Sequence, residues 1–231
     1  TAGRLLDLSA LGAINNSAGK IGAKQNVIVR AQQLDNSQQG QLTSEGTLTT
    51  RIGGQLDNRK GLIQANGAMD VQATRLDNRA GKVSGLDTLT VDSAEADNRG
   101  GTIRADKALT LRTGTLDNRS LGRLESKSAL TFDGTRLDNS DKGLITATGP
   151  LSLKAKEVIN NGAGRISGKG DIEANIDALS QQGGELVAEG NLTLTGKQLG
   201  NREDSLVASL KALTVNVDQI DNRGGSLSGG Q

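Results

Sequence analysis

The stretch Leu116-Asp117-Asn118-Arg119 decides the fold of this chain, because copies of it return throughout the sequence. Close copies include Leu56-Asp57-Asn58-Arg59 and Ile220-Asp221-Asn222-Arg223, and looser ones include Ile159-Asn160-Asn161. The third position of the motif recurs at intervals of 20 to 22 residues. So regular a period over the whole chain predicts a repeat architecture, in which each repeat forms one structural unit.

A single repeat has the pattern of short strands separated by corners. Thr102-Ile103-Arg104-Ala105 and Ala108-Leu109-Thr110-Leu111 each alternate apolar and polar residues, as half-buried strands do. Gly100-Gly101 precedes the first of them as a turn signal. A helix would need an apolar stripe over ten or more residues, and glycines interrupt every such window.

One such repeat cannot bury its apolar side alone, so we expect successive repeats to stack as the coils of a parallel β-helix. Each strand would pair with the same strand of the neighbouring coils at about 4.8 Å, which gives a rod of roughly 50 Å. The predicted fold class is all-β, a solenoid with coils of about 20 residues. The first inward position of the coils is assigned to Ile21, Leu42, Ile63, Val83, Ile103, Leu124, Ile145, Ile166, Leu186, Leu206 and Leu227.

The composition limits the classes of function. The 231 residues carry 27 basic and 26 acidic side chains, whereas nucleic-acid binding needs a clustered excess of Lys and Arg. No apolar run approaches the roughly 20 residues that span a bilayer. His and Cys are absent, so a nucleophile and its base would have to come from Lys, Asp or Glu. We therefore predict that the protein is not an enzyme, with no catalytic residue, cofactor or metal site.

The recurring Asn has a structural interpretation. Asn tolerates left-handed backbone geometry in turns, and amides stacked in register can hydrogen-bond from one coil to the next. Gln181 stands at the position where this ladder could break. The predicted ladder consists of Asn16, Asn36, Asn58, Asn78, Asn98, Asn118, Asn139, Asn161, Asn201 and Asn222.

Columns of Asp and Arg flank the Asn column, as Asp117 and Arg119 do in the motif above. Each column alone would repel itself, but side by side the two can neutralise one another, although exposed ion pairs stabilise by only about 0–1 kcal/mol each. The alternative is a cation site built from stacked Asp carboxylates, because oxygen clusters suit Ca²⁺. The basic residue beside each Asp favours ion pairing.

Both ends of the chain fall inside a repeat. Leu6 and Leu8 have the spacing of Leu151 and Leu153, and neither end has the atypical repeat that caps a solenoid. We expect residues 1–231 to be a single β-helical segment of a longer array.

The motif Leu116-Asp117-Asn118-Arg119, together with the pattern Gly-x-Ile-x-Ala-x-x-x-Leu-Thr-Leu from Gly101 to Leu111, resembles the twenty-residue adhesin repeat of the filamentous haemagglutinin family. That family includes the stick-like effectors of contact-dependent growth inhibition. The resemblance covers essentially the whole chain and departs at Leu179-Ser180-Gln181 and Leu199-Gly200-Asn201. It implies a right-handed parallel β-helix, secreted through an outer-membrane two-partner-secretion transporter, with a role in adhesion, virulence or toxin presentation on a Gram-negative cell surface.

The sequence allows three hypotheses about function. The leading hypothesis is a structural shaft that projects binding or toxin regions away from the cell, because the repeats are even and carry no long loops. The second is a direct face for a receptor or glycan of a host or target cell, although the aromatic residues that usually dominate interfaces are missing. The third, an enzyme on a β-helix scaffold, would need a groove built from long loops.

Overall fold

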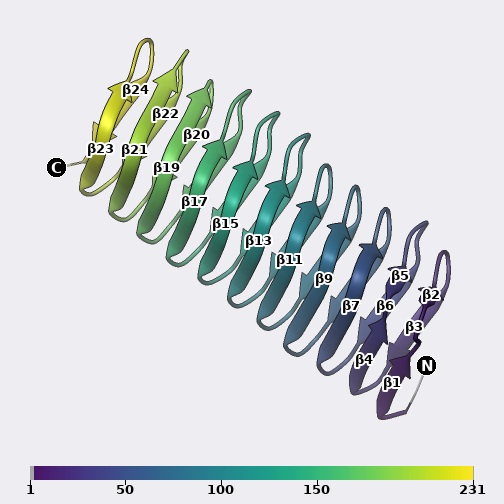
Figure 1. Ribbon diagram of the computed structural model, residues 1–231. Helices are drawn as coiled ribbons and strands as arrows, with labels where there is room; N and C mark the ends of the chain where they lie inside the picture. The colour runs from purple at the N-terminus through teal and green to yellow at the C-terminus, as the bar shows by residue number, and fades with distance from the viewer. Residues whose placement is uncertain (1–2, 231) are drawn as a thin grey trace.

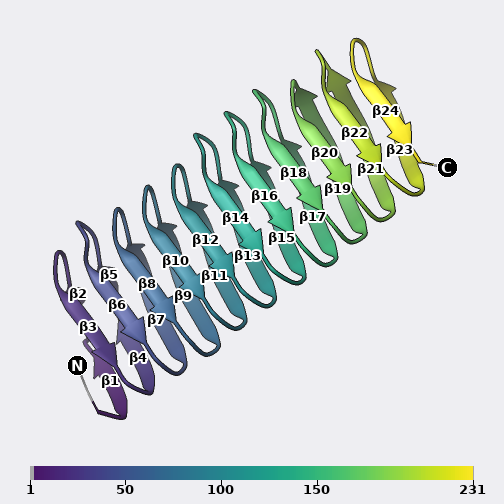
Figure 2. The same cartoon turned by 180° about the vertical axis from the view of Figure 1, so that it is seen from behind.

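The computed structural model describes residues 3–230, and these form an all-β solenoid (Figures 1 and 2). Its strands form two parallel sheets of 13 and 11 strands. The described residues include no helix, and so none of a length and apolarity suited to crossing a membrane. The predicted fold class is confirmed.

The first sheet contains mostly long strands. They are β1 (Leu5–Ser9), β2 (Ala13–Asn15), β4 (Asn26–Ala31), β5 (Gln33–Asp35), β7 (Leu48–Asp57), β9 (Met69–Asp77), β11 (Leu89–Asp97), β13 (Leu109–Asp117), β15 (Leu130–Asp138), β17 (Leu151–Ile159), β19 (Ile172–Gln182), β21 (Leu192–Arg202) and β23 (Leu213–Asp221). Each of the strands from β7 onward is followed directly by the corner that carries the repeated motif.

The second sheet contains only four-residue strands. They are β3 (Lys20–Ala23), β6 (Gln41–Ser44), β8 (Leu62–Ala65), β10 (Lys82–Gly85), β12 (Thr102–Ala105), β14 (Arg123–Ser126), β16 (Leu144–Ala147), β18 (Arg165–Gly168), β20 (Glu185–Ala188), β22 (Leu206–Ser209) and β24 (Ser226–Gly229). Every coil therefore contributes to both sheets, and eleven coils are stacked.

The coil has a right-handed sense. In Figure 1 the long strands run upward on the near side while the stack advances to the left, and from behind, in Figure 2, the short strands run downward. Equivalent residues pair directly between coils, as Leu89, Leu109 and Leu130 do along the first sheet. This register places like side chains on top of one another, so apolar residues form continuous columns in the interior.

The core lies between the two sheets. Its columns of Leu, Ile, Val and Ala are almost fully buried, and the single aromatic residue, Phe132, stacks between Leu111 and Leu153. Gly134 follows in the same strand, where a Cβ would overlap the carbonyl oxygen of Thr113 and lie 2.8 Å from Cζ of Phe132, closer than real contacts allow. The close approach of the neighbouring coil and the large ring therefore both require a glycine there.

One inward assignment is wrong. The second-sheet column runs from Leu186 to Val207 and on to Leu227, so Val207 and not Leu206 faces the core. Leu206 begins the strand and is half-buried on the outer side. The corner before it holds one residue more than the sequence pattern suggests, because Glu203 and Asp204 both adopt positive φ there.

The corner after each Asn has a tight backbone. One residue there has positive φ in the shorter coils, for example Lys60 at 56° and Ala80 at 53°. Two consecutive residues do so in longer coils, for example Ser120 and Leu121. The longer repeats with two such residues therefore place an extra residue at this corner.

Candidate functional site: the Asn ladder and the Asp–Arg lattice

The candidate site is the corner between the two sheets, where the repeated motif lies. The long strand ends at the Asp, the Asn follows it, and its side chain turns into the interior below the bend. Asn98 is fully buried, and its Nδ2 donates to Oδ1 of Asn118 in the next coil at 2.7 Å. The same amide donates to the carbonyl oxygen of Arg123 at 3.2 Å, at the start of β14. One side chain therefore links its own corner to the corner and to the second-sheet strand of the next coil.

These amides form an unbroken chain of side-chain hydrogen bonds. Each Nδ2, or Nε2 in the case of Gln, donates toward the C-terminal coil over distances of 2.6 to 3.1 Å. The members in order are Asn16, Asn36, Asn58, Asn78, Asn98, Asn118, Asn139, Asn160, Gln181, Asn201 and Asn222. All donors point the same way, so the ladder has a direction.

Asn161 was assigned to the ladder from the sequence, and this is a correction: Asn160 occupies that place. Asn139 donates to Oδ1 of Asn160 at 2.9 Å, and Asn160 donates to Gln181 at 2.7 Å. Val158 pairs with Leu137, so Ile159 takes the Asp position and Asn161 the Arg position. The Oδ1 of Asn161 is buried without a hydrogen-bond partner.

A sequence signal for the correct residue was present. The interval from the first inward residue of the long strand to the ladder is nine residues for Leu109 to Asn118, and also for Leu151 to Asn160. The copy Ile159-Asn160-Asn161 resembles Leu116-Asp117-Asn118, and this likeness suggests its third residue, Asn161, as the ladder residue. Leu48 to Asn58 spans ten residues, because a bulge between Ile52 and Gln55 adds one, so the interval alone was not decisive.

Gln181 continues the ladder and does not interrupt it. Its Oε1 accepts from Asn160, and its Nε2 donates to Asn201 at 3.1 Å. The residue is fully buried. Its side chain is one methylene longer than Asn, and β19 and β21 extend two residues further around the corner here than their neighbours do.

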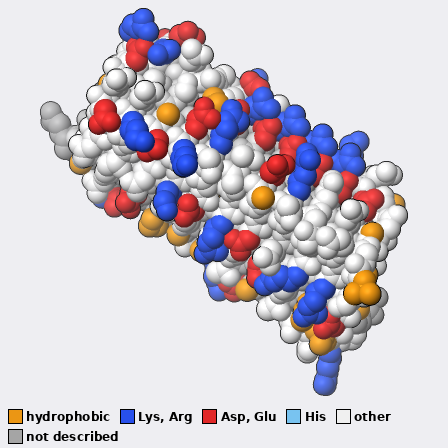
Figure 3. All heavy atoms as spheres, viewed as in Figure 1, with side chains coloured by type: hydrophobic (Ala, Val, Ile, Leu, Met, Phe, Trp, Pro, Cys, Tyr) orange, Lys and Arg blue, Asp and Glu red, His pale blue; other side chains and the backbone are white. Residues whose placement is uncertain are grey.

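The Asp–Arg lattice is the set of ion pairs outside the ladder formed by Asp57, Asp77, Asp97, Asp117, Asp138, Asp221, Arg59, Arg79, Arg99, Arg119, Arg202 and Arg223. Arg79 bonds Asp77 of its own coil at 2.6 Å and lies 3.5 Å from Asp97 of the next. The Asp side chains lie beneath, and the Arg side chains are more exposed. Figure 3 shows the resulting row of charges along this edge of the molecule.

Two carboxylates of the lattice, Asp117 and Asp221, have a lowered pKa. Burial alone would raise the pKa of Asp117, but hydrogen bonds from the Arg119 side chain and backbone, with the charges of Arg119 and Arg99, lower it on balance. The hydrogen bond to Arg223 lowers the pKa of Asp221. In turn the hydrogen bond to Asp77 raises the pKa of Arg79 further above its usual range. At Asp117, Asp221 and Arg79, the oppositely charged neighbour therefore favours the ionised form.

This geometry argues against the alternative of a cation site. The Asp carboxylates alternate with guanidinium groups, and most of these carboxylates form ion pairs with two Arg side chains, one on either side. Within residues 3–230, no group of three or more His, Cys, Asp or Glu side chains is arranged to hold a metal ion. The structure therefore brings these Asp residues together as ion-pair partners.

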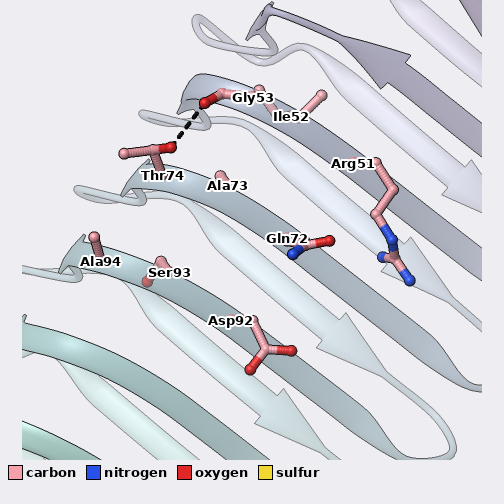
Figure 4. Close-up of a pocket in the computed structure, with 9 residues that line it drawn as sticks. All are labelled: Arg51, Ile52, Gly53, Gln72, Ala73, Thr74, Asp92, Ser93 and Ala94. Carbon is pink, nitrogen blue, oxygen red and sulfur yellow. Dashed lines mark hydrogen bonds between the residues drawn. The ribbon is translucent and has the colours of Figure 1, made fainter.

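A shallow hollow of about 580 Å³ lies on the outer face of the first sheet, where Arg51, Gln72 and Asp92 project from adjacent strands (Figure 4). Arg51 forms an ion pair with Asp70, and Asp92 lies 3.5 Å from Arg112. The charges of Arg51 and Asp92 are thus paired between coils.

Comparison with known proteins agrees with this geometry. The sequence profile described as "Haemagglutinin repeat" matches residues 1–60, 57–97, 83–155, 146–209 and 198–231, which together span the chain. The chain belongs to the haemagglutinin-repeat family. No curated protein and no solved structure matches it. The resemblance stated from the sequence is confirmed. In this haemagglutinin-repeat chain, the conspicuous motif Leu-Asp-Asn-Arg supplies in turn a core residue, a lattice carboxylate, a ladder amide and a lattice cation.

Proposed function

We propose that this haemagglutinin-repeat segment is a structural shaft of a secreted bacterial surface adhesin, part of a longer chain, which holds binding or toxin regions away from the cell. The observation that supports this role is the unbroken ladder from Asn16 to Asn222. Both sheets also run continuously beside it. A rod tied together between all coils resists bending and local opening better than separate domains on linkers.

The proposal is tested by removing whole coils. Deletion of residues 59–98 joins Asn58 to Arg99 and removes two coils of 20 residues each, leaving a corner of equal length. The rod should shorten by about 10 Å and stay folded, as measured by small-angle X-ray scattering and circular dichroism. The matched control deletes residues 59–88, one and a half coils, which joins Asn58 to Leu89 and puts the first-sheet strand β11 in the place of a second-sheet strand, so the stack should be interrupted at the junction. A shaft role is wrong if the two deletions behave alike.

Secretion by the two-partner route is the second part of this proposal. Its support is membership of the haemagglutinin-repeat family. Removal of the cognate outer-membrane transporter from a Gram-negative producing cell should leave the exoprotein inside, while its expression level is unchanged. Surface display without the transporter, measured by antibody labelling of whole cells, would contradict this route.

A further inference from the structure

Arg202 differs from the other Arg residues of the Asp–Arg lattice in lacking an Asp two residues before it, although Glu203 and Asp204 follow it in the corner. In the other coils the Arg donates from Nε and Nη2 to the Asp two residues earlier, as Arg119 does to Asp117 at 3.0 and 2.8 Å. The residue two positions before Arg202 is Gly200, which pairs in the sheet with Asp221 of the next coil. The place of the carboxylate in this coil is therefore empty.

The donors of Arg202 are only partly used. Its Nε lies 2.7 Å from Oδ2 of Asp221, yet this nitrogen is buried and no acceptor is aligned with its N–H. Asp221 already accepts hydrogen bonds from Nε and Nη2 of Arg223. Nε of Arg202 is thus covered by Asp221, but the fork formed by Nη1 and Nη2 makes no side-chain hydrogen bond within residues 3–230 and has the planar geometry that binds a carboxylate through two parallel hydrogen bonds.

A hollow of about 440 Å³ lies beside this fork. It opens because the Asp column is replaced by Ser180 and Gly200 in two successive coils. Gln198 and Gln219, which are neighbours across β21 and β23, add two amides to its lining. The volume is within the usual range of small-molecule sites.

The charges around the hollow are favourable for one anionic group. Glu157 lines the hollow but is paired with Arg136 at 2.7 Å, and Asp221 is bonded by Arg223. These acids are thus largely neutralised by their own partners. What remains for a ligand is one guanidinium fork, two amides and the hydroxyl of Ser180. Amides and hydroxyls suit a ligand rich in hydroxyl groups.

We propose that this hollow binds a sugar acid, a ligand that combines one carboxylate with several hydroxyl groups. The ligand carboxylate takes the place beside Arg202 that an Asp carboxylate takes in the other coils. The side chains of Gln198, Gln219 and Ser180 bind the hydroxyl groups. This site goes beyond the shaft role and is independent of it, because a shaft needs no ligand.

The test follows the Nε–H resonances of the Arg side chains in the ¹⁵N-labelled chain by NMR. Addition of D-glucuronate should shift the Arg202 resonance saturably, with an affinity about tenfold tighter than that of acetate, which lacks the hydroxyls. Glucose, which lacks the carboxylate, should leave it unchanged. A linear, unsaturated shift would overturn the site, and equal affinity for acetate and glucuronate would overturn the ligand class.

Two variants change which coil lacks the Asp carboxylate. Gly200→Asp supplies an internal carboxylate, and a Cβ there meets nothing nearer than the Leu179 carbonyl oxygen at 3.7 Å. This variant should lose the saturable shift at Arg202 while its melting temperature is at least that of the wild type. Asp117→Gly empties the equivalent place beside Arg119, where Thr115 and Arg136 stand at the positions of Gln198 and Gln219. Arg119 should therefore respond to acetate and to glucuronate with similar affinity. Persistence of the Arg202 response in Gly200→Asp, or no response at Arg119 in Asp117→Gly, would overturn the proposal.

Discussion

The side-chain amide of Asn78 donates a 2.7 Å hydrogen bond to Oδ1 of Asn98, one coil away, and both residues are fully buried. The same Nδ2 donates to the carbonyl oxygen of Thr102 at 3.2 Å. A buried amide that loses such partners bears the full cost of its desolvation. The ladder therefore stabilises the stack and also penalises any coil that slips out of register.

The ladder assignment predicts a large difference between two adjacent residues. Asn160→Ala removes the donor to the buried Oε1 of Gln181 and leaves that oxygen unpaired, while Nδ2 of Asn139 keeps the carbonyl oxygens of Gly143 and Arg165. The free energy of unfolding should fall by roughly 1–3 kcal/mol. Asn161→Ala is the matched control and should change it by less than about 1 kcal/mol, because that side chain is outside the ladder. Urea unfolding measures both, and equal effects would show that the ladder does not stabilise the fold.

Thr50 offers a stabilising substitution. Its side chain is fully buried, its hydroxyl has no hydrogen-bond partner, and its neighbours in the column are Val29 and Val71. Thr50→Val removes the unpaired hydroxyl without changing shape, so the free energy of unfolding should rise by about 1–2 kcal/mol.

The control for this change is Thr90→Val in the outward row of the same sheet, which should stay within about 0.5 kcal/mol of the wild type. A higher urea midpoint for Thr50→Val alone is the expected pattern. A lower midpoint would mean that the hydroxyl of Thr50 has a partner in solution.

Two glycines should respond oppositely to the same substitution. A Cβ at Gly101 would overlap the carbonyl oxygen of Asn78 and lie 2.7 Å from Oδ1 of Asn98, so Gly101→Ala should destabilise by roughly 1–3 kcal/mol. Gly85 stands between Ala65 and Ala105 in its column, and a Cβ there meets nothing nearer than 3.6 Å.

Gly85→Ala should therefore leave the stability unchanged or raise it by up to about 1 kcal/mol, because Ala has less freedom in the unfolded chain. Thermal unfolding of the two variants, compared with the wild type, checks the pair. Similar melting temperatures for Gly101→Ala and Gly85→Ala would contradict the close approach of the corner to the ladder.

Acid should weaken the Asp–Arg lattice. The folded-state pKa of Asp117 is lowered, so the unfolded chain binds more protons and stability rises with pH in this range. The contribution is complete above the unfolded value of about 3.9 and is lost as pH falls through the lower folded value. Asp117→Asn should be less stable than the wild type at pH 7, and this difference should shrink as pH falls below about 4.

Urea unfolding across this pH range measures the difference directly. Added salt at about 1 M should also reduce it, because the Asp117 side chain is 26% exposed and Arg119 is 40% exposed. A gap between wild type and variant that stays constant from neutral pH to pH 2 would rule out the ion pair as its cause.

Much of the fold could be predicted because the repeat carries its information locally. The spacing of Leu109 and Leu111 gives the inward side of a strand, and the Asn period gives the length of a coil. Most of the lattice followed in the same way, because Asp117 and Arg119 are two residues apart. Local spacing could not place Asn160 or Val207. An extra residue fits either within a strand or at a corner, and the sequence of a single coil does not show which.

The sequence by itself determined the all-β solenoid, its stacked corners and the kinds of side chain inside it, because a period of about 20 residues leaves each repeat only its neighbours to pack against. Only the tertiary structure decided which amide enters the ladder, that Gln181 continues it, and that Nε of Arg202 lies against Asp221 of the next coil. These depend on hydrogen-bond register between coils, which is set by pairing across the whole sheet and not by any single repeat.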